Sequence, residues 1–179
     1  MALLNRLNTY AICVAVAWLA TTAPARARAN QLELAVKATY LYKLAPFVNW
    51  PAAPAGTPLA ICVQGDDPFG PMLDRAVAGQ KVGERPVVLK RLARLEAGSG
   101  CQIAYVAGSQ VQSPVQALQA VAGASVLTVT DEAHGAARGI VNLVLDGGKV
   151  RFSIDTRQAD SNGIAISSKL LALAVEVKR

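Results

Sequence analysis

The chain has 179 residues, 53% of them hydrophobic, and a formal net charge of +6. This length suffices for one domain that buries a core without help from metal ions. Arg6, Arg26 and Arg28 lie in the first 29 positions, which hold no acidic residue, so the rest of the chain has 15 basic against 12 acidic residues and a net charge of +3. A domain so close to neutral, whose only basic cluster lies at residues 90–94, lacks the charge expected of a nucleic-acid-binding protein.

Residues 1–29 are typical of a secretory signal peptide. Arg6 precedes a ten-residue apolar run at residues 11–20, and Ala27 and Ala29 supply the small residues that a signal peptidase recognises. The run is shorter than the roughly 20 residues that span a bilayer. We therefore expect export, cleavage before Asn30 and a mature domain over residues 30–179; the alternative is a retained helix that anchors the protein in the membrane.

The mature chain opens with an amphipathic helix. Leu34, Ala38 and Leu41 recur at spacings of three and four, whereas Lys37 falls largely outside this apolar pattern and is expected to face solvent. Pro46 removes a backbone donor and clashes with the preceding turn, so the helix is expected to end near residue 44.

Four short apolar runs predict strands, at residues 59–63, 86–92, 102–106 and 125–130. Helical segments are predicted at residues 72–79 and 113–121, the second with Ser113 as its cap and Pro114 in its first position. Strands separated by such helical segments are typical of a parallel sheet that helices cover.

From residue 140 the pattern changes to alternation. Apolar residues such as Leu143 and Phe152 alternate with polar neighbours on both sides of Gly147-Gly148, which predicts an antiparallel hairpin with one solvated face. An amphipathic helix, capped by Ser167 or Ser168, is expected to finish the chain. The predicted fold is a single α/β domain with a mixed sheet, in which parallel βα units are followed by a C-terminal antiparallel hairpin and helix.

The residues that catalysis or metal binding needs are mostly missing. His134 is the only histidine, and neither a Gly-x-Ser-x-Gly nucleophile motif nor a third mature cysteine accompanies it. The acidic pairs at residues 66–67 and 131–132 follow strands, where turn and capping roles are common. We expect no enzyme activity, no cofactor and no metal site, and we expect His134 to be an ordinary loop residue.

Cys62 and Cys101 are the cysteines of the mature chain, and in an exported protein such a pair favours a disulfide. Two separate buried thiols are the alternative. If the strands at residues 59–63 and 102–106 were parallel neighbours in simple register, the two α-carbons would lie about 13–16 Å apart, beyond the limit of about 7 Å for a disulfide. Either the strands are staggered or reversed, or the bridge does not form.

Tyr40, Tyr42, Phe47 and Trp50 concentrate aromatic residues in one short segment. Tyr40 and Tyr42 lie on different sides of a helix, so the four side chains cannot all face one core. Aromatic residues are favoured anchors of protein interfaces. Some of them are therefore expected at a partner surface, unless they cover one edge of the sheet.

Three stretches, residues 37–51, 140–154 and 164–174, together resemble the YfiR-like family of periplasmic regulatory proteins. The resemblance extends over about residues 37–175. It implies a periplasmic α/β domain that tends to form homodimers, and it favours the Cys62–Cys101 disulfide, because the family has a cysteine pair placed in this way.

The resemblance also implies a function. Such a protein represses an inner-membrane diguanylate cyclase by binding its periplasmic sensor region, and an outer-membrane peptidoglycan-binding lipoprotein sequesters it; cyclic-di-GMP signalling and biofilm formation respond. The candidate partner-binding residues are Tyr42, Phe47, Trp50, Ile164 and Ile166. The alternative is a periplasmic small-ligand-binding protein with its pocket at the strand ends of the α/β sheet.

Overall fold

The computed structural model describes residues 23–51 and 56–179. The chain divides into two compact units, Met1–Glu33 and Leu34–Arg179, and the second contains the α/β domain. Most of the expected signal peptide, residues 1–22, lies outside the described residues. Helix α2 (Ala23–Lys43) is continuous through the expected cleavage position between Ala29 and Asn30.

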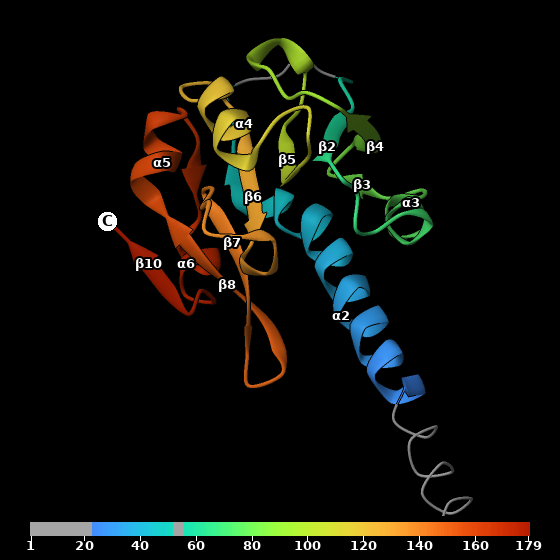
Figure 1. Ribbon diagram of the computed structural model, residues 1–179. Coiled ribbons are helices and arrows are strands. Elements are labelled where there is room, and N and C mark those ends of the chain that lie inside the picture. The colour runs from blue at the N-terminus through green and yellow to red at the C-terminus, as the bar shows by residue number, and fades with distance from the viewer. Residues whose placement is uncertain (1–22, 52–55) are drawn as a thin grey trace, which may run out of the picture. The chain divides into compact units, whose positions relative to one another are not determined.

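The domain is built on an eight-stranded mixed sheet, which confirms the predicted α/β class (Figure 1). The strand order is β10-β8-β7-β6-β5-β2-β4-β3. The five central neighbours β7, β6, β5, β2 and β4 run parallel, while β3 and β8 pair antiparallel with β4 and β7. The strands are β2 (Leu59–Gly65), β3 (Lys81–Val82), β4 (Arg85–Leu92), β5 (Ile103–Gly108), β6 (Leu127–Asp131), β7 (Val141–Asp146), β8 (Lys149–Asp155) and β10 (Glu176–Lys178).

The helices between the strands are short. They are α3 (Pro71–Val77), α4 (Pro114–Ala120), α5 (Thr156–Ser161) and α6 (Ser168–Leu171), with 3-10 turns η1 (Ala45–Phe47), η2 (Ala97–Ser99) and η3 (Glu132–His134). Ser113 caps α4 as predicted, because its hydroxyl accepts a hydrogen bond from the Gln116 backbone N–H. Helix α2 ends at Lys43, just before Pro46, which confirms the predicted stop.

The C-terminal segment differs from the prediction of one long helix. Helix α6 ends at Leu171, and the chain then forms β10 beside β8, with Val177 opposite Ile154. The Val175 N–H donates to the Phe152 carbonyl, which starts this pairing. The apolar spacing alone favoured a helix, but the open edge of β8 offers the segment backbone hydrogen bonds that no isolated helix end provides.

The two faces of the sheet carry separate apolar clusters. One face packs against α2, α3, α5 and α6, and its cluster includes Leu41, Leu73 and Tyr105. The other face packs against α4, and its smaller cluster contains both disulfide cysteines. The sheet is therefore covered on both faces over its parallel strands, as parallel sheets require.

The Cys62–Cys101 disulfide is present, although β2 and β5 are parallel neighbours in simple register. Cys62 lies opposite Ala104, so Cys101 would be too far away if it continued the line of β5. It does not, because the chain bends at Gln102, and the two α-carbons lie 5.8 Å apart. The bridge is thus confirmed, while the expectation that it required staggered or reversed strands is wrong.

Strands β7 and β8 form the predicted hairpin. Gly147 and Gly148 make the turn with φ of 54° and 73°, values in which glycine avoids the steric cost that other residues incur. Only residues 141–143 of β7 pair with β6, so the outer half of the hairpin extends past β5 and β6, as Figure 1 shows in orange.

Candidate partner-binding surface

The segment that follows α2 is held against the C-terminal third of the chain. Strand β1 (Val48–Asn49) pairs antiparallel with β9 (Ala165–Ile166), so that Val48 lies opposite Ile166. The Phe47 carbonyl also accepts a hydrogen bond from the Ser167 N–H. Two of the stretches that carry the family resemblance, far apart in sequence, therefore meet at one place.

An apolar groove of about 210 Å³ lies between the end of α2 and strand β8. Tyr40 forms one side: its hydroxyl donates to the Val150 carbonyl at 3.3 Å, and its ring packs edge-on against Phe152. Leu173, just after α6, is 60% exposed at the groove. The residues that line the groove are Tyr40, Lys43, Leu44, Phe47, Arg151, Phe152, Leu170 and Leu173.

A second hollow of about 190 Å³ adjoins the groove at Phe47, which lines both. The β1–β9 pair forms its floor, and its lining residues are Pro46, Phe47, Val48, Asn49, Ala165, Ile166 and Ser167. We call the groove and this hollow together the Phe47 surface. Its lining residues come from six separate elements, α2, η1, β1, β8, β9 and α6.

The charged residues that line the Phe47 surface are both basic. Lys43 and Arg151 are exposed, and the Lys43 ammonium lies 5.7 Å from the centre of the Tyr42 ring. No acidic residue is among the described residues that line either hollow. A partner segment that is apolar with acidic flanks would match this distribution.

The candidate partner-binding residues lie in different surroundings. Phe47 and Ile166 line the Phe47 surface, whereas Tyr42 and Trp50 are half-buried and pack against the core beside it. The Trp50 indole N–H is buried and has no hydrogen-bond partner among the described residues. Ile164 is 2% exposed and belongs to the core, so its side chain does not reach the surface.

Sequence reasoning missed Arg151, Phe152, Leu170 and Leu173 as members of this surface. Phe152 and Leu170 were expected only as core residues of a strand and a helix. Leu173 was placed within a longer amphipathic helix, and only the early end of α6 exposes it. The local pattern contains no signal for this, because exposure here depends on the pairing of β10 with β8.

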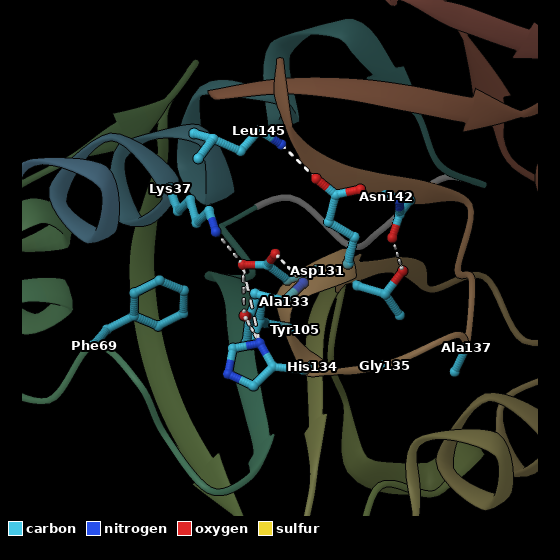
Figure 2. A network of polar contacts seen from close by, with 12 residues as sticks. Lys37, Phe69, Tyr105, Asp131, Ala133, His134, Gly135, Ala137, Asn142 and Leu145 are labelled. Carbon is cyan, nitrogen blue, oxygen red and sulfur yellow. Dashed lines mark hydrogen bonds and ion pairs between the residues drawn. The ribbon is translucent and has the colours of Figure 1, made fainter. Parts of the chain in front are cut away.

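A buried polar network anchors α2 to the sheet (Figure 2). Lys37 and Asp131 form an ion pair at 2.6 Å, and their side chains are 3% and 1% exposed. The expectation that Lys37 faces solvent is therefore wrong. Its position between Leu34, Ala38 and Leu41 on the core side of the helix was the signal, because residues three and four apart share a helix face.

Asp131 has further partners at the end of β6. Its second carboxylate oxygen accepts from the Ala133 N–H, and the Tyr105 hydroxyl lies 3.5 Å from the oxygen that binds Lys37. Tyr105 also lies 3.3 Å from the Nδ1 atom of His134, which Figure 2 shows at the outer side of the network. Its members come from α2, β5, the end of β6 and η3, so the network holds these elements together.

The described residues contain no group of three or more His, Cys, Asp or Glu side chains that could hold a metal ion. Within the same part of the chain, no helix combines the length and the apolar character that crossing a bilayer demands. The Phe47 surface lies on a disulfide-linked scaffold, and partly exposed apolar side chains of this kind suit binding to another protein.

Comparison with known proteins is consistent with this arrangement. No curated protein matches the chain. A family model described as YfiR/HmsC-like matches residues 34–175, which span the whole sheet up to β10, the disulfide and the Phe47 surface. The chain therefore belongs to the YfiR/HmsC-like family.

Proposed function

We propose that this protein is a periplasmic regulator that represses an inner-membrane diguanylate cyclase by binding the periplasmic sensor region of the cyclase. Family membership supports the regulatory role. The observation that carries the binding role is the Phe47 surface, where apolar side chains, among them the strongly exposed Leu173, line adjoining hollows with two basic residues. Such patches mark interaction sites on soluble domains.

Export is part of the proposal. Residues 1–29 act as a signal peptide, and the mature protein begins at Asn30. The disulfide supports this, because such bridges persist in oxidising compartments such as the periplasm. Mass spectrometry of the periplasmic fraction is expected to find a chain that starts at Asn30; a full-length chain in that fraction would contradict the export step.

The repression is tested with one charged substitution on the Phe47 surface. Leu173→Glu places an acidic group among the apolar residues, and we expect it to abolish co-purification with the cyclase from detergent-solubilised membranes and to raise cellular cyclic-di-GMP and biofilm. Val115→Glu is the matched control, because Val115 is similarly exposed on α4, at 54%, outside the surface. If both variants still bind and repress, the Phe47 surface is not the binding site.

Two further partners belong to the same proposal. An outer-membrane peptidoglycan-binding lipoprotein is proposed to relieve repression by sequestering the protein, and the protein itself is proposed to form homodimers. Family membership supports both. Sedimentation of the purified mature protein, with and without the soluble part of the lipoprotein, is expected to show a dimer that the lipoprotein binds. A monomer would contradict the proposed homodimer, and a sedimentation coefficient that the lipoprotein leaves unchanged would contradict the proposed sequestration.

A further inference from the structure

A polar cleft of about 220 Å³ lies on the sheet face opposite α2. On this face α4 covers β5, and residues 132–139 cross β6, where the Gly139 N–H donates to the Thr130 hydroxyl. Beyond them, β7, β8 and β10 present polar side chains to solvent. The cleft is lined by Glu132, Arg138, Gly139, Asn142, Val144, Ser153, Ile154, Asp155, Val175, Glu176 and Lys178.

Asn142 supplies the cleft with a hydrogen-bond donor. The residue is 3% exposed, and its side-chain oxygen accepts from the Thr130 hydroxyl at 3.0 Å, the contact drawn beside Asn142 in Figure 2. Within residues 23–51 and 56–179, its amide nitrogen has no hydrogen-bond partner. This nitrogen is therefore available to donate to a ligand oxygen in the cleft.

The sheet register places three side chains of the cleft in a row across neighbouring strands. Asn142 lies opposite Ser153 on β8, and Ser153 lies opposite Glu176 on β10. Arg138 stands at the Asn142 end, because its neighbour Gly139 binds the same threonine that binds Asn142. The row therefore runs from a cation and an amide donor to an acid, across two strand spacings of about 4.8 Å each.

The charges in the cleft do not neutralise one another. Among the described residues, no ion pair joins Arg138 or Lys178 to Glu132, Asp155 or Glu176. Asp155 pairs with Arg157, which does not line the cleft. Positive and negative side chains that line one cleft without forming ion pairs are suited to a ligand that carries both a positive and a negative charge.

Other ligand classes fit less well. The described lining contains no aromatic side chain on which a sugar or a base could stack, and no group of three metal ligands. A phosphate-rich ligand would be repelled, because three acidic residues and only two basic residues line the cleft.

We propose that this cleft binds a short zwitterionic peptide, two residues long, with its carboxylate at Asn142 and Arg138 and its ammonium at Glu176. Two extended residues span about 7 Å, and the row is about 10 Å long between α-carbons, so the two ends of such a peptide come within a side chain's length of the two ends of the row. This site is separate from the Phe47 surface, and the inference does not depend on the proposed repression of a cyclase.

The test uses the purified mature protein and L-alanyl-L-alanine or D-alanyl-D-alanine as probes, followed by NMR of the Asn142 side-chain amide. We expect its signals to move in proportion to occupancy. N-acetylation or C-terminal amidation of the probe is expected to weaken binding at least tenfold, because each removes one charge from the pair. Arg138→Gln and Glu176→Gln are expected to weaken it by a similar factor.

Controls make the outcome decisive. Arg75→Gln and Glu84→Gln remove the same charges from exposed positions on α3 and the β3–β4 turn, and they are expected to leave binding unchanged. The proposal is overturned if the Asn142 amide signals stay fixed at about 10 mM probe, where binding with a Kd of about 1 mM is nearly complete. Equal binding of the capped peptides would overturn it as well.

Discussion

The buried ion pair between Lys37 and Asp131 is predicted to contribute strongly to the attachment of α2 to the sheet, and removing Lys37 tests this. In Lys37→Met the helix keeps an unbranched apolar side chain of similar length, but Asp131 remains as a buried carboxylate without its cation. Removing one partner of a buried pair destabilises a protein by about 3–5 kcal/mol. The Ala133 N–H and the Tyr105 hydroxyl still face Asp131, so we expect the low end, about 3 kcal/mol.

This loss is large against a total stability of about 5–15 kcal/mol. With a urea dependence of about 2 kcal/mol per molar, it corresponds to a fall of about 1.5 M in the midpoint of urea unfolding. Circular dichroism at neutral pH measures this midpoint directly.

The matched control removes both charges. In Lys37→Met combined with Asp131→Asn, the amide oxygen still accepts from the Ala133 N–H, and no buried charge is left. We expect the double variant to regain at least half of the lost stability. The reasoning is refuted if Lys37→Met unfolds within about 0.5 M of the wild type, or if the double variant is no more stable than the single one.

Three further predictions concern the scaffold. Cys62→Ala combined with Cys101→Ala is expected to lower the free energy of unfolding by about 4 kcal/mol, the chain-entropy value for a separation of 39 residues, and reductant should cost the wild type a similar amount but leave the variant unchanged. Gly147→Val is expected to lose about 1–2 kcal/mol in thermal unfolding because φ is 54° there, whereas Gly147→Asn should be nearly neutral; equal losses would contradict the turn geometry. Partial burial raises the pKa of Asp155, but hydrogen bonds from the Gln158 backbone, Arg157 and the Gln158 side chain outweigh it, so the pKa is lowered overall. A carboxyl whose pKa is lowered by folding stabilises above its unfolded value, about 3.9, so Asp155→Asn should be less stable than wild type at pH 7 and equal to it at about pH 2; a constant difference would contradict this.

Much of the local structure follows from the sequence because the responsible interactions are short-range. Ser113 and Pro114 begin α4, Pro46 follows the end of α2, and Gly147-Gly148 forms the hairpin turn, each within a few residues of the feature it determines. The family assignment also came from the sequence, since it depends on such local stretches.

Other features depend on residues that are distant in the sequence. The side-chain pattern could not show that the edge of β8 would pair with β10, and so end α6 early and expose Leu173. The bend at Gln102 that brings Cys101 to Cys62, the burial of Lys37 against Asp131, and the row from Asn142 to Glu176 likewise arise when separate elements pack together. Backbone propensity reflects interactions between residues that are close in sequence. Which strand pairs with a sheet edge, which residue neutralises a buried charge and which side chains line a cleft are determined only when distant parts of the compact chain meet.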